Sequence, residues 1–266
     1  MRPSVGRWKG AFSLMGTVTV RNLTIGQGIP KICIPIVAAT REEILEEARE
    51  ILSLPFDLVE WRCDWYKDIF ANGTRQILTD LREILGNFPI LCTFRTKEEG
   101  GAREASENQY LDLLHEILSD GLADLADLEL FTLKDSLKEL TATANVKGIK
   151  TIVSSHDFQH TPPKSEILRR FQMMSDAGAD IAKVAAMPET PEDVLNLLDA
   201  SREFSKNPDN IPVIAMSMGR LGSVSRLCGQ TFGSSVTFGS ARKTSAPGQF
   251  PARELKMIMT LMAKES

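Results

Sequence analysis

The chain has 266 residues, of which 42% are hydrophobic and 25% charged, and its formal net charge is −4. This length supports a sizeable core in one large domain or two small ones, and the acidic balance argues against a nucleic-acid-binding protein, whose surface must neutralise phosphates. No run approaches the ~18 consecutive apolar residues of a membrane span, so we expect a soluble metabolic enzyme without a membrane partner.

The first 16 residues contain no acidic side chain, and their apolar stretch, Ala11 to Met15, is too short for the core of a signal peptide. We expect residues 1–16 to form a short frayed extension and residues 17–266 to form a single catalytic domain. Apolar residues then alternate from Thr17 to Ile25 around Arg21-Asn22, a pattern that predicts a short β-hairpin.

From Lys31 onward, short apolar runs rich in Val and Ile alternate with amphipathic stretches. The runs predict eight strands, at residues 31–37, 57–64, 89–95, 124–130, 150–157, 180–187, 212–218 and 235–239. Their near-continuous apolarity is typical of strands buried on both faces of a parallel sheet. Eight strand-helix units predict an α/β fold of the (β/α)8 TIM barrel type, in which the hairpin closes the N-terminal mouth. A doubly wound open sheet is the alternative, but its usual glycine fingerprint is missing.

Capping signals support the helices of this pattern. Thr40 followed by Glu43 is a capping box before the first helix, and Thr190-Pro191 predicts an N-cap followed by proline at the first helical position. Asn72 is the predicted N-cap of the second helix.

Four cysteines are present, and none belongs to a Cys-x-x-Cys pair, so their spacing indicates neither a zinc site nor a redox motif: Cys33, Cys63, Cys92 and Cys228. Three of them lie in apolar runs, where a thiol packs as a small hydrophobic group. We expect a reducing, cytoplasmic compartment. No histidine or carboxylate set has the spacing of metal ligands, so we expect a mechanism without a metal.

Charged residues crowd the predicted C-terminal ends of the strands, where the reactive residues of such barrels lie. Lys183 stands inside the apolar run 180–187, where a lysine is costly unless it is paired or its amine becomes neutral. A neutral amine attacks a carbonyl carbon and forms a Schiff base. The alternative is a strand-end lysine that reaches solvent or pairs with a carboxylate.

His156 ends the strand before that of Lys183, 27 residues earlier, so the two side chains would lie on neighbouring strands. An imidazole beside an imine-forming lysine is suited to proton transfer, because its pKa lies near neutrality. His160, in the loop after the same strand, is the nearby rival.

Three arginines, Arg62, Arg95 and Arg226, are candidates for binding a carboxylate or phosphate at this mouth. The alternative is a set of ion pairs with the neighbouring acidic residues Glu60, Glu99 and Glu129. Gly219 and Gly222 could instead cradle a phosphate.

At these positions the sequence closely resembles type I 3-dehydroquinate dehydratase (3-dehydroquinase), a Schiff-base enzyme, from about Thr17 to the C-terminus. The matching blocks are Glu-Trp-Arg-Cys-Asp at 60–64, Thr-Phe-Arg at 93–95, Glu-Glu-Gly-Gly at 98–101, Asp-Leu-Glu-Leu at 127–130, Ser-His-Asp-Phe at 155–158, Ala-Lys-Val-Ala at 182–185, Met-Ser-Met-Gly at 216–219, Ser-Arg at 225–226 and Ser-Ala-Pro-Gly-Gln at 245–249.

The resemblance implies dehydration of the small molecule 3-dehydroquinate to 3-dehydroshikimate in the shikimate pathway, with no cofactor and with a homodimeric assembly. It implies a Lys183 Schiff base, His156 as proton donor and acceptor, and Glu99 orienting His156. Arg226 would bind the substrate carboxylate, and the remaining implied binding residues are Glu60, Arg62, Arg95, Ser245 and Gln249. Pro35 departs from the family pattern, which has a serine nearby, so we expect altered affinity.

Two other functions remain open from the residues alone. A class I aldolase also places a Schiff-base lysine on the sixth strand of such a barrel, but it would usually need a phosphate site. A non-catalytic barrel that binds a small carboxylic acid predicts that the lysine, the histidine or the glutamate is missing, and all three are present.

Overall fold

The structure is a computed structural model that describes residues 16–71 and 73–263. Apart from Gly16, whose N–H donates to the Asn210 carbonyl at 2.9 Å, the predicted N-terminal extension lies outside the described residues. Asn72 lies outside them too, and the structure places Gly73 at the N-cap of the second helix.

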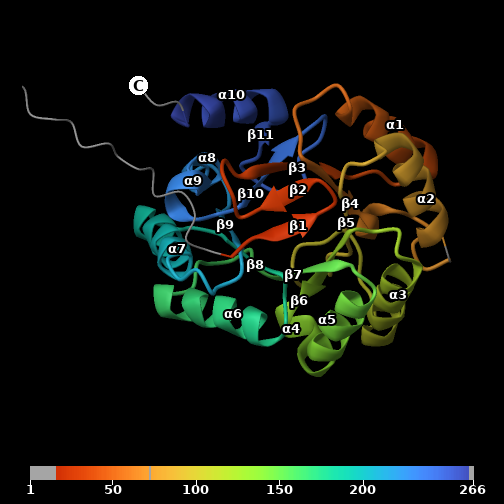
Figure 1. Ribbon diagram of the computed structural model, residues 1–266, viewed down its shortest axis with the longest axis horizontal. Coiled ribbons are helices and arrows are strands. Elements are labelled where there is room, and N and C mark those ends of the chain that lie inside the picture. Colours follow the sequence, from red (N-terminus) through yellow and green to blue (C-terminus); the bar gives the residue numbers. More distant parts are fainter. Residues whose placement is uncertain (1–15, 72, 264–266) are drawn as a thin grey trace, which may run out of the picture.

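Parallel strands form the centre of the molecule, and each predicted strand is confirmed (Figure 1). They are β3 (Lys31–Ile36), β4 (Leu58–Arg62), β5 (Ile90–Thr93), β6 (Leu125–Glu129), β7 (Lys150–Asp157), β8 (Ile181–Ala186), β9 (Val213–Ser217) and β10 (Val236–Ser240). Neighbours pair in chain order from β3 to β9, and β10 pairs with β3. The Ser235 N–H donates to the Val213 carbonyl at 2.8 Å, which links the last two strands and closes the barrel. The predicted (β/α)8 barrel is therefore confirmed.

Helices surround the strands on their outer side (Figure 1). The longer ones are α1 (Arg41–Ile51), α2 (Thr74–Leu85), α3 (Glu107–Asp120), α5 (Leu137–Val146), α6 (Lys164–Asp176), α7 (Pro191–Phe204) and α10 (Ala252–Met262). The short elements are η1 (Cys63–Trp65), α4 (Leu130–Leu133), η2 (Lys134–Ser136), α8 (Val224–Leu227), α9 (Gly229–Phe232) and the two-residue strand β11 (Phe250–Pro251), which pairs with β10.

Two helix starts have the predicted caps. Thr40 and Glu43 form a reciprocal capping box at α1, and Thr190 caps α7, where Pro191 is the first helical residue. None of the described helices is long and apolar enough to cross a membrane. The four cysteines are buried and free of disulfide bonds.

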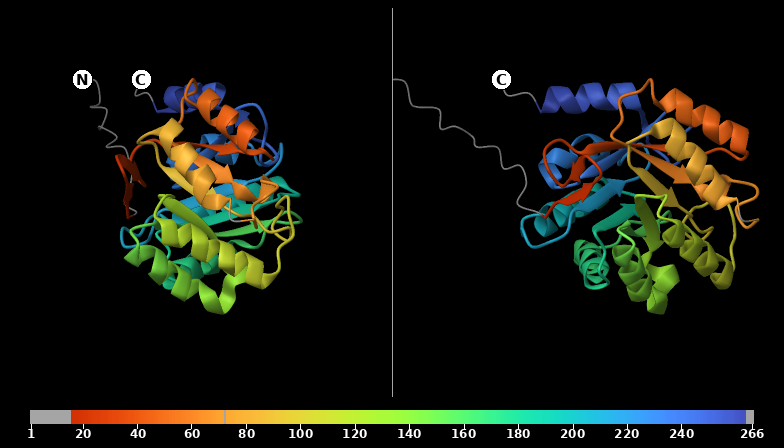
Figure 2. Two further views of the ribbon diagram at one scale, coloured as in Figure 1. Left: turned by 90° about the vertical axis from the view of Figure 1, so that its right-hand side faces the viewer. Right: turned by 45° about the vertical axis from the view of Figure 1, so that its right-hand side comes forward.

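The predicted hairpin is also confirmed: β1 (Val18–Val20) pairs antiparallel with β2 (Leu23–Ile25). Its apolar face, Val18, Val20 and Ile25, packs against residues at the N-terminal ends of the barrel strands, which are Cys33, Leu58, Leu91, Leu125, Ile152, Ile181, Ile214 and Val236. Figure 2 shows the hairpin covering one end of the barrel. Arg21 in its turn donates to Asp124 at 2.6 Å and to Asn87 at 3.0 Å, which fixes the hairpin to the loops at this end.

The inward-facing side chains change character along each strand. Because side chains alternate with a period of two, Leu125 is followed on the same face by Asp127 and Glu129, and Ile181 is followed by Lys183. Apolar residues therefore fill the lower interior, beside the hairpin, and polar residues fill the upper interior at the C-terminal ends.

Candidate active site

A pocket opens at the C-terminal ends of the strands, where the sequence places the reactive residues. Eight of the predicted site residues line it: Glu60, Arg62, Arg95, Glu99, His156, Lys183, Ser245 and Gln249. Its other lining residues are Thr93, Gly100, Phe158, Ala185, Met216, Met218, Phe238 and Ala246. Pro35 pairs with Glu60 in the sheet and is not among these lining residues.

Lys183 lies in the middle of β8, with only 5% of its side chain exposed. Its Nζ atom is 3.2 Å from Oδ2 of Asp127 and 4.9 Å from the centre of the Phe238 ring. The lysine is therefore a buried amine whose end reaches the pocket.

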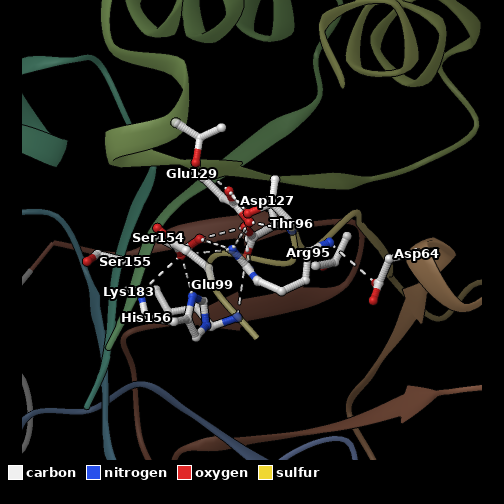
Figure 3. A network of polar contacts seen from close by, with 12 residues as sticks. Asp64, Arg95, Thr96, Glu99, Asp127, Glu129, Ser154, Ser155, His156 and Lys183 are labelled. Carbon is white, nitrogen blue, oxygen red and sulfur yellow. Dashed lines mark hydrogen bonds and ion pairs between the residues drawn. The ribbon is translucent and has the colours of Figure 1, made fainter. Parts of the chain in front are cut away.

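His156 and Glu99 form a buried pair beside this lysine (Figure 3). Nδ1 of His156 lies 2.9 Å from Oε2 of Glu99, and the same oxygen accepts the His156 backbone N–H at 3.0 Å and Arg95 Nη1 at 3.3 Å. Oε2 already accepts two hydrogen bonds and therefore acts as an acceptor, so the hydrogen bond to His156 needs a proton on Nδ1. We assign the ring proton to Nδ1, which leaves Nε2 unprotonated and able to act as a base.

Burial determines the charge state of this pair. It lowers the pKa of His156 well below its ordinary value, and the positive charges of Arg95, Lys183 and Arg62 act in the same direction. Burial also raises the pKa of Glu99 to about 8, against the pull of Arg95 and with the support of nearby carboxylates. The ring is therefore neutral at physiological pH and able to accept a proton.

Arg95 is the centre of the polar network in Figure 3. Its guanidinium contacts Asp127 at 2.7 Å, Glu129 at 2.9 Å and Ser154 at 3.0 Å, besides Glu99. Burial opposes the charge of Arg95, but the three carboxylates outweigh it and raise its pKa above the ordinary value. Arg95 therefore forms ion pairs with Glu99 and Glu129, as the alternative interpretation of the arginines predicted.

Arg62 and Glu60 are also partnered. Arg62 makes a bidentate ion pair with Asp64, with both distances 2.8 Å, and Asp64 is not one of the acidic residues that the ion-pair alternative named. Glu60 accepts a hydrogen bond from Thr93 Oγ1 at 2.9 Å. Both side chains are held in place while still lining the pocket.

Arg226 differs from the other predicted residues, because it lies beneath the loop 245–249 and is not among the residues that line the pocket. It is 2% exposed, and its Nη2 donates to the Pro247 carbonyl at 2.9 Å. Its Nε has no hydrogen-bond partner, and within the described chain no carboxylate forms an ion pair with it. Burial lowers its pKa to about 10.

The loop over the pocket is held by its own side chains. Gln249 accepts a hydrogen bond from the Ser245 backbone N–H at 2.8 Å and donates to Ser245 Oγ at 2.9 Å. The Gly219 N–H donates to the Pro247 carbonyl at 3.3 Å. This N–H, which a phosphate cradle would use, therefore holds the loop.

Sequence reasoning did not assign Asp127 and Ser154 to the site. A signal for Asp127 was present in the sequence: two carboxylates, Asp127 and Glu129, stand two residues apart within an apolar strand.

His160 lies outside the pocket: its side chain is 61% exposed and sits 3.4 Å from Asp157. Within residues 16–71 and 73–263, no group of three His, Cys, Asp or Glu side chains is placed to hold a metal.

Comparison with known proteins assigns the chain to a family. The sequence model of type I 3-dehydroquinase matches residues 32–266. The chain belongs to the type I 3-dehydroquinase family. The chain is also similar to two curated proteins that are named 3-dehydroquinate dehydratase. They come from Clostridioides difficile strain 630 and Syntrophotalea carbinolica. The first is 42% identical over 93% of this chain and 97% of its own length, and the second is 44% identical over 93% and 98%.

Solved structures of type I 3-dehydroquinases have the same fold. A crystal structure of the type I 3-dehydroquinate dehydratase of Clostridium difficile, with covalent modified comenic acid, matches with a TM-score of 0.89 at 41% identity, covering 94% of this chain and 98% of that one. The 3-keto-L-gulonate-6-phosphate decarboxylase of Vibrio cholerae matches at 13% identity with a TM-score of 0.55, over 88% of this chain and 99% of that one, and shares the barrel fold alone.

Proposed function

We propose that the chain dehydrates 3-dehydroquinate to 3-dehydroshikimate through a Schiff base on Lys183. The observation that carries this proposal is the shared pocket of a buried lysine and a neutral histidine whose Nδ1 is held by Glu99. Membership of the type I 3-dehydroquinase family supplies the substrate class. The non-catalytic alternative loses support, because all three groups lie together in one pocket.

The chemistry follows from these groups. The Lys183 amine replaces the oxygen of the substrate ketone, releasing water, and the protonated imine withdraws electrons from the neighbouring carbon. Nε2 of His156 takes the proton from that carbon, and the electron pair forms an enamine. The enamine then expels the β-hydroxyl, which leaves as water with the proton from His156. Hydrolysis of the product imine restores Lys183.

Arg226 is the proposed partner of the substrate carboxylate. It is a buried guanidinium with an unpartnered Nε and no carboxylate of its own, so an incoming anion would supply the missing charge. We propose that Glu60, Arg62 and Arg95 position the hydroxyl groups, and that Ser245 and Gln249 cover the ring from the loop. An aldolase would need a phosphate site, and the Gly219 N–H is already used by the loop.

The experiment that tests this function is the formation of a conjugated enone, followed by ultraviolet absorbance. Purified protein mixed with 3-dehydroquinate is expected to produce the enone absorbance, which neither alternative function generates. Borohydride added with substrate should abolish the activity, whereas borohydride without substrate should leave it intact. A folded protein that produces no enone contradicts the proposal.

The loop is expected to be sensitive to substitution at Gly248. This residue has φ +80°, and a Cβ atom there would lie 2.4 Å from the Gly219 carbonyl oxygen. Gly248→Ala should cost the closed loop about 1–3 kcal/mol, which is roughly a 5- to 150-fold loss of kcat/KM. Gly121→Ala is the control, because its φ is +63° but nothing lies within 4 Å of the added atom. Equal kcat/KM for the two variants would contradict a role of the loop in binding.

We further propose that residues 17–266 act as one catalytic domain, that the enzyme is a homodimer and that it is cytoplasmic. The four free, buried cysteines support a reducing compartment. Sedimentation velocity of the full chain tests the assembly, and a single species of monomer mass contradicts it.

A further inference from the structure

We propose that Asp127 is the counter-ion of the protonated imine on Lys183, an inference that rests on the function proposed above. Asp127 lies on β6 and Lys183 on β8, so the two side chains meet across Ser154 of the intervening strand β7 (Figure 3). The contact between Asp127 Oδ2 and Lys183 Nζ is 3.2 Å. Among the described residues, Asp127 is the only carboxylate within ion-pair distance of this amine.

The two oxygens of Asp127 have different partners. Oδ1 accepts Arg95 Nη2 at 2.7 Å and Ser154 Oγ at 2.6 Å, whereas Oδ2 faces Lys183. The side chain is fully buried and held by two donors before the lysine is counted. Its orientation is therefore fixed by groups other than the amine that it faces.

Asp127 is ionised in this setting. Burial would raise its pKa, but the charges of Arg95 and Lys183 and the Ser154 hydrogen bond outweigh burial and lower the pKa below the ordinary value. Arg95 is itself balanced by Glu129, whose Oε1 lies 2.9 Å from Nη1, so Asp127 keeps a negative charge for Lys183.

One carboxylate can serve the amine both before and after imine formation. Overall, the ammonium and the ketone give the protonated imine and one water, so the nitrogen carries one positive charge at the beginning and at the end. In between, Nε2 of His156 takes a proton from the ammonium, and the same proton leaves with the hydroxyl of the addition product as water. A fixed carboxylate 3.2 Å from Nζ therefore matches both charged states without moving.

Asp127 is not among the residues that line the pocket, so it acts on the nitrogen and not on the substrate ring. The other titratable groups that face Lys183 come from the surrounding strands and the loops that follow them. They are Cys33 from β3, Glu60 and Arg62 from β4, Arg95 and Glu99 after β5, and His156 from β7.

Trapping with borohydride measures the protonated imine directly, because hydride adds to its carbon. The rate at which borohydride fixes the product to Lys183 is measured against pH by mass spectrometry of the intact protein. In Asp127→Asn, the pH above which trapping declines should move down by about 1–3 units relative to the unmodified protein. Asp127→Glu, which restores the charge, should reverse part of the shift.

Glu129→Gln is the matched control, because Glu129 is also a buried carboxylate of β6 that pairs with Arg95, but it makes no ion pair with Lys183. Its trapping profile should shift by less than half as much. Equal shifts in the two variants would show that any buried charge of the network suffices and would overturn the proposal. An unshifted Asp127→Asn profile overturns it too.

A measurement on the unmodified protein covers the case in which Asp127→Asn does not fold. The infrared C=N band of the product imine should move on transfer to D2O, as a protonated imine requires, up to the highest pH at which the protein stays folded. Loss of this shift near neutral pH overturns the counter-ion. If no adduct forms on Lys183 at any pH, the proposed function fails instead, so the two failures are distinguishable.

Discussion

Replacing Lys183 by methionine is expected to abolish dehydration, with a fall in kcat on the order of 10⁴-fold or more. Methionine keeps an unbranched chain of similar length against Phe238 but cannot form an imine. Steady-state enone formation measures the loss, and the intact mass after borohydride treatment with product should show no adduct. Circular dichroism and thermal unfolding establish that the variant is folded, because Asp127 loses one of its partners.

Lys150→Met is the control for this substitution. Lys150 begins β7 at the opposite end of the barrel, where it pairs with Asp180 at 2.9 Å and has no contact with the pocket. This variant should retain both its activity and its borohydride adduct. Residual enone formation in Lys183→Met above a hundredth of the normal rate would contradict the Schiff-base mechanism.

The second large effect is expected at His156. His156→Ala should slow dehydration by about 10²–10⁴-fold, the usual contribution of a positioned acid or base. Given a longer incubation, borohydride with product should still attach a mass to Lys183, because the amine and its partner Asp127 remain, although loss of the histidine slows formation of the imine. Quenched trapping and enone formation, measured on the same preparation, separate imine formation from removal of the proton at carbon.

His160→Ala provides the comparison, since that ring is exposed and pairs with Asp157 outside the pocket. Its kcat should stay within about twofold, as for a surface substitution.

The pH dependence of kcat/KM tests the same assignment of His156. Burial lowers the pKa of His156, so the ring stays neutral as pH falls through 6.5. The acidic limb of kcat/KM that belongs to His156 should therefore lie below pH 6.5, and a limb above that value would contradict the assignment.

The sequence predicted the barrel because parallel strands buried on both faces produce apolar runs at a regular spacing. It also placed Lys183 and His156 on neighbouring strands, since both follow from strand order and from the position of strand ends. Strand order gives the place of a side chain around the barrel, and its position along the strand gives its height. For these two residues, that height was enough to bring them into one pocket.

The partners of the charged residues could not be read in the same way. Several carboxylates lie at similar heights near Arg95, and which of them its guanidinium contacts depends on side-chain rotamers and on how neighbouring strands are staggered. Asp127 and Lys183 are 56 residues apart and reach each other across an intervening strand. Arg226 comes from a short helix and not from a strand end, so the strand rule does not place it.

The hairpin at the lower end of the barrel has a consequence for how substrate enters and product leaves the enzyme. Within residues 16–71 and 73–263, Val18, Val20 and Ile25 pack against an interior that is apolar below the charged network. The pocket lies at the opposite, C-terminal end and is lined by Ser245 and Gln249 of the loop, so we expect substrate, product and the released water to share this mouth. With the loop over the bound ring as proposed, we expect each turnover to need one opening and one closing of that loop, and departure of the product to compete for the same exit with arrival of the next substrate.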